Sequence, residues 1–231
     1  WVDFDNDYKT MNPDYMESIW WVAKSLWDKG LIYEGKYILP YCPRCATVLS
    51  THELAQGYKD VKDTAVTVRF KITKAPEAID DKDLENGRTY FIAWTTTPWT
   101  LPSNLGLCMG PEIDYVKILD KESGDFYIFA EARLCAYYKN PEDYEIIYRR
   151  KGKDFIGAEY EPLFPYFASL SDPSECERIS GQKCSEGAFR MFNAAYVSTE
   201  DGTGIVHIAP AFGEDDNLVF RGSGVPNVEP I

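Results

Sequence analysis

The chain contains only two histidines, His52 and His207, among its 231 residues. A metal site built from several histidines is therefore excluded. Cations are also scarce, because 24 Lys and Arg stand against 37 Asp and Glu and give a net charge of −13. Since phosphates are held by clustered cations, this balance argues against binding nucleic acid by bulk charge alone. A local basic track or a contact to the end of a strand stays open.

Long hydrophobic runs are missing as well, and none approaches the roughly 20 residues that span a bilayer. No basic segment followed by an apolar one opens the chain. The six cysteines do not form the dense framework of a small disulfide protein, because a chain with 45% hydrophobic residues can bury an ample core. We therefore expect a soluble, ordered protein of a reducing compartment, in the cytoplasm, with no membrane partner.

The first element that the sequence predicts is a helix over residues 13–29. Asn12 is a capping residue, Pro13 occupies the first helical position and Gly30 ends the pattern. The apolar face is wide and includes Trp20 and Trp27. A core helix is the ordinary interpretation, but so much aromatic surface favours a helix that packs on a neighbouring domain.

Downstream, short apolar segments alternate with polar turns, and few of them have helical spacing. Many short strands with few helices are typical of a barrel-like β domain, so we expect a mainly β fold with flanking helices, of the α+β class. Residues 1–60 are interpreted as a helical and linker segment, 61–221 as the β-rich domain and 222–231 as a tail of uncertain structure. The predicted strands cover residues 66–72, 90–94, 115–120, 126–130, 144–148, 196–198 and 204–208.

The densest motif runs from Trp94 to Asn104, where a strand passes into a loop that Pro98 and Pro102 keep out of any sheet ladder. Three threonines at 95–97 present hydroxyls there, which suit a sugar hydroxyl, a carbonyl or a held water. Ordinary strand propensity explains a threonine run by itself. The flanking tryptophans and prolines favour a functional site.

The second motif runs from Gly202 to Asp216. A glycine-flanked turn precedes a short apolar strand that carries His207, and a loop then ends in Glu214, Asp215 and Asp216. Such a loop can present a carboxylate to an ammonium group. A solvated acidic turn or a helix N-terminus is the ordinary alternative.

Taken together, the two motifs resemble the editing domain of the isoleucyl-tRNA synthetase family, which is inserted in the catalytic body of class I synthetases for isoleucine, valine and leucine. Thr97 matches the isoleucine version, because the valine and leucine relatives carry arginine there. Tyr8–Met11 and Met16–Trp21 resemble the segment before the insertion, so the resemblance covers nearly the whole chain and looks closer to eukaryotic-type enzymes. The family's His-x-Gly-His and Lys-Met-Ser-Lys-Ser signatures are missing. The chain therefore resembles an excised fragment without aminoacylation, and ATP binding belongs to the full-length ligase.

The resemblance implies post-transfer editing, in which a positioned water hydrolyses the ester of mischarged valyl-tRNA(Ile). One methylene discriminates by only about 1–3 kcal/mol, and the isoleucine enzyme facing valine is itself the standard example of that limit. A second, smaller sieve is needed, and we expect His207 to act as its wall rather than as a general base. By resemblance, the site residues are Thr95, Thr96, Thr97, His207 and Asp216, with Trp94, Asn104 and Asp215 as substrate-binding neighbours.

The expected partners are the 3′ end of tRNA(Ile) carrying valine and the catalytic body of the synthetase, and the chain is expected to be a monomer. Editing needs no cofactor and no metal in the site. Cys42 and Cys45 form half a zinc knuckle, but Cys176 and Cys184 are too widely spaced to complete it and His52 is a weak ligand, so an unmetallated turn is favoured. That ligand count opposes a zinc-dependent hydrolase. A non-catalytic module that binds the tRNA end or docks on a partner is the alternative.

Overall fold

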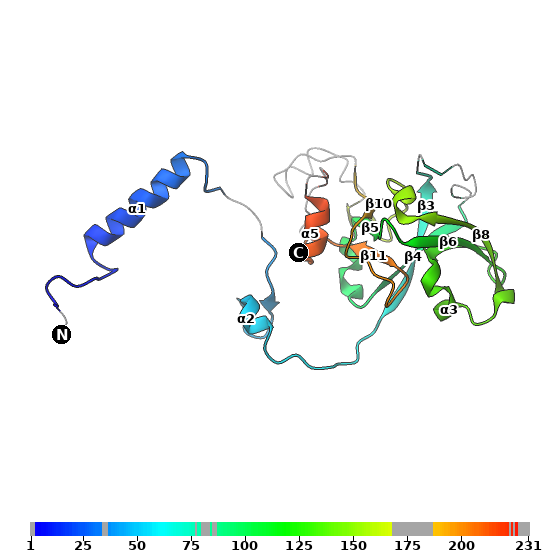
Figure 1. Ribbon diagram of the computed structural model, residues 1–231, viewed down its shortest axis with the longest axis horizontal. Coiled ribbons are helices and arrows are strands. Elements are labelled where there is room, and N and C mark those ends of the chain that lie inside the picture. The colour runs from blue at the N-terminus through cyan, green and yellow to red at the C-terminus, as the bar shows by residue number, and fades with distance from the viewer. Residues whose placement is uncertain are drawn as a thin grey trace. The chain divides into compact units, whose positions relative to one another are not determined.

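The computed structural model describes residues 3–33, 37–76, 78–79, 84, 87–167, 187–221, 223 and 225 (Figure 1). The chain divides into two compact units, Trp1–Tyr37 and Ile38–Ile231, earlier than the boundary at 60/61 that the sequence suggested. Cys176, Cys184 and nearly all of the predicted tail lie outside the described residues. No helix in the described part of the chain is long and apolar enough to cross a membrane.

In its described residues, the first unit contains one helix, α1 (Pro13–Asp28), which confirms the predicted helix. Pro13 occupies its first position, as expected for a residue that lacks an amide proton. None of its side chains is buried, and Trp20 and Trp21 are each 70% exposed. The apolar face therefore stays uncovered within this unit.

The second unit begins with a small hairpin of β1 (Tyr41–Cys42) and β2 (Thr47–Val48), followed by α2 (Thr51–Leu54). Within the described residues, nine further strands form one sheet in the order β11-β5-β10-β9-β3-β4-β7-β6-β8. Their bounds are β3 (Val66–Lys74), β4 (Thr89–Thr95), β5 (Gly106–Met109), β6 (Asp114–Asp120), β7 (Phe126–Ala130), β8 (Tyr144–Lys151), β9 (Glu159–Tyr160), β10 (Arg190–Asn193) and β11 (Ile205–Ile208).

Most neighbouring strands are antiparallel, but β4 pairs with β7 and β5 pairs with β10 in parallel. The sheet curls, because β11 at one edge packs against β4 in its middle. Alternate side chains of the strands enclose the main core, in which Phe70, Phe91 and Tyr115 are fully buried. A mainly β, barrel-like domain with few helices is therefore confirmed.

The other helices that the structure describes in this unit are short, and all but the last lie between strands. They are η2 (Pro98–Ser103), η3 (Glu131–Arg133), α3 (Leu134–Tyr137), η4 (Pro141–Asp143), η5 (Gly152–Phe155), η6 (Pro165–Phe167) and α5 (Glu214–Phe220). In Figure 1, α5 lies beside β10, β5 and β11. Its Phe220 ring packs on Phe192 of β10 with a centroid distance of 4.9 Å.

Residues 196–198 are not the strand that their apolar pattern predicts. The strand β10 ends at Asn193, and the amide of Val197 donates to the carbonyl of Ala194 at 3.4 Å. This hydrogen bond closes a turn, so the chain has left the sheet before Tyr196.

Candidate active site

The triple threonine lies where β4 passes into η2. Thr95 is the last residue of β4, and Pro98 begins η2. The Thr97 amide donates to the Thr95 hydroxyl oxygen at 3.0 Å, and the Thr100 hydroxyl donates to the Thr97 carbonyl at 2.8 Å. These bonds fold the loop on itself, which fixes the hydroxyls in one compact cluster.

The second motif reaches the same place through a turn that needs glycine. Gly202 has φ +66°, and a Cβ there would lie 2.8 Å from the ring of Trp94. Gly204 has φ +74°, and a Cβ there would lie 2.5 Å from the Cβ of Ala130. Only glycine combines this backbone with so close an approach. The turn therefore sets β11, with His207, antiparallel to β5.

Both motifs line one cavity of about 410 Å³, which we call the threonine cavity. Segments more than 100 residues apart in the sequence meet here, because β11 packs against β4. No Lys or Arg is among the lining residues. They are Trp94, Thr95, Thr96, Thr97, Trp99, Thr100, Val206, His207, Ala209, Phe212, Gly213 and Asp216.

His207 is a buried wall of this cavity, with 6% of its surface exposed. Its Nε2 lies 2.8 Å from the Thr100 hydroxyl oxygen. That hydroxyl gives its single proton to the Thr97 carbonyl, so we infer that Nε2 carries the ring proton and donates. Nδ1 is buried and has no hydrogen-bond partner among the described residues. Burial lowers the pKa of His207 to about 4, so the ring is neutral near pH 7 and is a weak base there.

Asp216 supplies the carboxylate of the cavity from the first turn of α5. Its Oδ2 accepts the Ala209 amide at 2.9 Å, and its Oδ1 accepts the Tyr196 hydroxyl at 3.4 Å. Burial raises the pKa of Asp216, while these two donors oppose that rise. The side chain has no ion-pair partner among the described groups around it. A partly buried carboxylate without a cation is suited to bind one from a ligand.

Two of the predicted neighbours are not in the cavity. Asn104 is buried elsewhere, where its amide donates to the Gly106 carbonyl at 2.8 Å and its oxygen accepts the Tyr160 hydroxyl at 2.6 Å. Both ends of that amide are used to hold the strands together, and the expectation that it binds substrate stays a prediction. Asp215 is exposed and outside the lining, because consecutive helical side chains point about 100° apart. The other predicted site residues line the cavity, and their roles stay predictions.

Several lining residues were missed from the sequence. Thr100 follows Thr97 by three positions, which places the two on one side of a 3₁₀ turn, and that spacing was the available signal. Trp99 and Phe212 line the cavity while 64% and 47% exposed. Tyr196 gave no signal, because its contact with Asp216 depends on the turn after β10.

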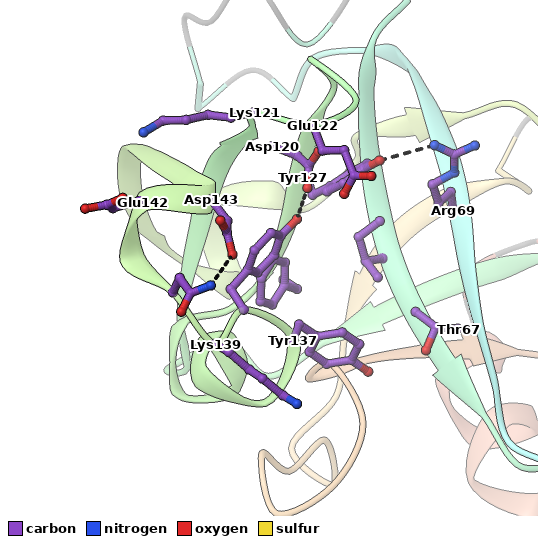
Figure 2. A pocket seen from close by; sticks show the side chains of 14 residues that line it. Thr67, Arg69, Asp120, Lys121, Glu122, Tyr127, Tyr137, Lys139, Glu142 and Asp143 are labelled. Carbon is purple, nitrogen blue, oxygen red and sulfur yellow. Dashed lines mark hydrogen bonds between the residues drawn. The ribbon is translucent and has the colours of Figure 1, made fainter.

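A second and larger hollow of about 920 Å³, which we call the tyrosine groove, contains none of the predicted site residues. Figure 2 shows the Tyr127 hydroxyl pointing at Arg69, which donates to it at 3.2 Å. The Tyr138 hydroxyl donates to Asp120 at 2.7 Å. The hydroxyls of Tyr127 and Tyr138 in the groove are thus paired.

Cys42 and Cys45 flank the tight turn between β1 and β2. The Cys45 amide donates to Sγ of Cys42 at 3.4 Å, and Ala46 adopts φ +54°. No group of three or more His, Cys, Asp or Glu residues able to hold a metal occurs among the described residues. The expectation of an unmetallated turn at Cys42 and Cys45 stays a prediction.

The chain belongs to the class I tRNA synthetases for isoleucine, leucine, methionine and valine, whose family pattern matches residues 1–209. It is 54% identical to an isoleucine–tRNA ligase of Treponema denticola over 100% of this chain and 22% of that protein. It is 49% identical to the cytoplasmic isoleucine–tRNA ligase of Mus musculus over 95% of this chain and 16% of that protein. The chain therefore spans about a fifth of the length of the relatives it matches, which include bacteria and eukaryotes. The expectation of a eukaryotic-type enzyme stays a prediction.

Solved structures of leucyl-tRNA synthetase editing domains are more distantly similar. The domain from P. knowlesi has 14% identity and a TM-score of 0.48, over 72% of this chain and 65% of that one. A domain from P. falciparum has 13% identity and a TM-score of 0.43, over 66% and 63%. Membership of the family rests on the sequence matches.

Proposed function

We propose that the threonine cavity hydrolyses the ester that joins valine to the terminal ribose of tRNA(Ile), the editing activity of an isoleucine–tRNA ligase. The observation that carries this proposal is the Asp216 carboxylate, which is partly buried, faces the cavity and has no cation beside it. An aminoacyl ester brings an α-ammonium group that supplies the missing charge. The isoleucine–tRNA ligase relatives support this choice of substrate.

The hydrolysis uses a positioned water and no covalent intermediate. Thr100 is the hydroxyl nearest to the imidazole, but its proton is engaged by the Thr97 carbonyl. The Nδ1 atom of His207 has no carboxylate partner among the described residues, so the arrangement of a catalytic triad does not form. The ester is already activated by its ammonium group, and the clustered hydroxyls of Thr95 and Thr97 provide donors and acceptors that hold a water.

Discrimination follows from the walls of the cavity. His207 is neutral, buried and fixed by its bond to Thr100, so it acts as a rigid boundary for the amino-acid side chain. Valine fits beside it, and the additional methylene of isoleucine meets the ring. Because one methylene is worth about 1–3 kcal/mol, a fixed wall converts that small difference into rejection of the cognate ester.

A non-catalytic binding or docking role is the second candidate, and the uncovered apolar face of α1 favours it. We propose that α1 packs on the catalytic body of the synthetase, since the chain matches about a fifth of its relatives. The 3′ end of tRNA(Ile) is the proposed nucleic-acid partner, the protein acts as a monomer, and the cytoplasmic relatives of Mus musculus and Saccharomyces cerevisiae support the cytoplasm as its location.

The direct test is deacylation of valyl-tRNA(Ile) by the purified chain, with and without a metal chelator. Loss of a cation partner from a partly buried carboxylate site costs several kcal/mol, so Asp216→Asn should reduce hydrolysis by about 100-fold or more. Asp215→Asn, one residue away and outside the cavity, is the matched control and should resemble the parent.

Chelator-insensitive hydrolysis that depends on Asp216 supports editing. Sensitivity to the chelator would support a metal-dependent hydrolase instead. If the parent chain binds the tRNA end but does not hydrolyse the ester, the result supports the non-catalytic binding role.

A further inference from the structure

The carboxylate of Asp216 is held from two sides by donors that come from different segments. The Ala209 amide donates to Oδ2 at 2.9 Å, and the Tyr196 hydroxyl lies 3.4 Å from Oδ1. A carboxylate that accepts from both sides is restricted in rotation about its Cβ–Cγ bond. We propose that Tyr196 is a positioning residue that keeps Asp216 ionised and aimed at the substrate ammonium. This inference rests on the proposed editing function.

Packing fixes Tyr196 relative to Asp216. Ala194 and Val197, on either side of the tyrosine turn, are buried in one apolar cluster with Phe220 of α5. The Val197 amide closes the turn on Ala194, and Phe220 also packs on Phe192 of β10. The turn that carries Tyr196 and the helix α5 that carries Asp216 therefore pack on the same apolar cluster. This shared packing fixes the Tyr196 hydroxyl next to the Asp216 carboxylate.

The Tyr196 hydroxyl is the donor in its hydrogen bond with the Asp216 carboxylate. Burial, together with nearby Cys108 and Asp216, raises the pKa of Tyr196 well above its ordinary value, so the hydroxyl stays protonated at neutral pH. The Cys108 thiol also interacts with this phenol, and burial raises the pKa of Cys108 to about 12, so it is neutral too. Of these two neighbours the ionised Asp216 is the much stronger acceptor, and the Tyr196 hydroxyl donates to it at 3.4 Å.

Few groups around Asp216 stabilise its ionised form. Asp215 on the same helix repels its negative charge, Cys108 of β5 is neutral, and no cation is among the described groups around it. The Ala209 amide and the Tyr196 hydroxyl are the interactions that oppose burial. Of these two, only Tyr196 can be removed by a side-chain substitution.

The test is Tyr196→Phe in the whole 231-residue chain, assayed by deacylation of valyl-tRNA(Ile) across pH. Loss of one hydrogen bond to a charged group predicts a KM about 10-fold higher, with kcat little changed. Asp216 acts in its ionised form, and loss of a donor raises its pKa. The acid limb of the activity profile should therefore move to higher pH by roughly half a unit to one unit.

Tyr138→Phe is the matched control, because Tyr138 donates to Asp120 at 2.7 Å outside the threonine cavity. It should leave the KM and the acid limb unchanged. Should Tyr196→Phe keep the parent's KM and acid limb while Asp216→Asn abolishes hydrolysis, the positioning role is refuted and the editing function stands.

An NMR titration of the Asp216 carboxyl carbon separates this inference from catalysis, because it needs no turnover. A higher pKa of Asp216 in Tyr196→Phe than in the parent supports the role of Tyr196. Equal values overturn it whether or not the chain hydrolyses the ester. An inactive parent refutes the editing function and, with it, the assignment of a substrate ammonium to Asp216.

Discussion

The threonine cavity and the tyrosine groove adjoin on one sheet, since Trp94 lines the cavity and its cross-strand partner Thr67 lines the groove. The groove is more than twice as large, at about 920 Å³ against about 410 Å³. Yet the hydroxyls of Tyr127 and Tyr138 in the groove are engaged by Arg69 and Asp120. Among the described residues, the smaller cavity keeps a carboxylate without a cation and an imidazole nitrogen without a partner.

From this difference we expect unused polar groups, rather than volume, to mark the site of chemistry. A buried polar group without a partner costs free energy, and the fold retains it where a ligand supplies the missing interaction. The hydroxyls of Tyr127 and Tyr138 in the groove already have partners and gain less from a polar ligand. The variants at Thr97, Thr67 and Tyr138 below separate the two hollows.

The largest expected effect is obstruction of the threonine cavity by Thr97→Arg. Thr97 is half-buried and is followed by Pro98, whose fixed φ leaves the loop little freedom to move aside. We expect hydrolysis of valyl-tRNA(Ile) to fall by about 100-fold or more, because the arginine side chain displaces the ester from the position in which water can attack it. Thr67→Arg places the same bulk in the tyrosine groove and should leave the rate unchanged. If Thr97→Arg and Thr67→Arg lost hydrolysis to the same extent, the threonine cavity would not be the site that the substrate occupies.

The next effect concerns stability and pH, and it follows from burial of His207. The folded pKa is about 4 and the unfolded pKa is about 6.5, so the unfolded chain binds more protons between these values. The free energy of unfolding should therefore fall by roughly 3 kcal/mol as the pH drops from 6.5 to 4. Urea titrations across this range measure it. His207→Gln should remove the slope, whereas His52→Gln, at an exposed position, should keep it.

A smaller effect is expected on specificity when the wall is removed. His207→Ala should keep hydrolysis of the valyl ester and gain hydrolysis of isoleucyl-tRNA(Ile) by about 10-fold to 200-fold, the value of one methylene. Deacylation of both esters by the same preparation measures the change. If His207 were instead the general base, both rates would fall together. His52→Ala serves as the control because it lies in α2, outside the cavity.

The smallest effect is expected in the tyrosine groove. Tyr138→Phe removes the bond to Asp120 and should lower the free energy of unfolding by about 1 kcal/mol. Hydrolysis of valyl-tRNA(Ile) should stay at the parent rate. A clear fall in hydrolysis at unchanged stability would give the groove a part in the reaction.

Much of the fold could be predicted because its signals are local. The alternation of Val66 to Ile72 predicts β3, and the cap and proline before Tyr15 predict α1. Residues 196–198 show the limit, since their apolar pattern fits a strand while a turn hydrogen bond decides the structure. The periodicity of apolar residues alone does not show at which residue a chain leaves a sheet.

The candidate site could be predicted where a motif carries its own geometry. Thr95–Thr97, His207 and Asp216 come together as expected, because the glycine turn at 202–204 sets the strand that carries the histidine. Asn104 lies outside the lining of the cavity, and its partner Tyr160 lies 56 residues further along the chain. A side chain's partner across the sheet is not encoded in its own motif.

The most direct test of the central claim is to locate a substrate analogue on the protein. A non-hydrolysable amide analogue of 3′-valyl-adenosine, titrated into the chain, carries the ammonium, the valine side chain and the ribose together. Backbone NMR shifts should change at Thr96, Thr97 and Ala209 around the threonine cavity, and Asp216→Asn should abolish them. Shifts centred instead on Tyr127 and Tyr137 in the groove, unaffected by Asp216→Asn, would contradict the account.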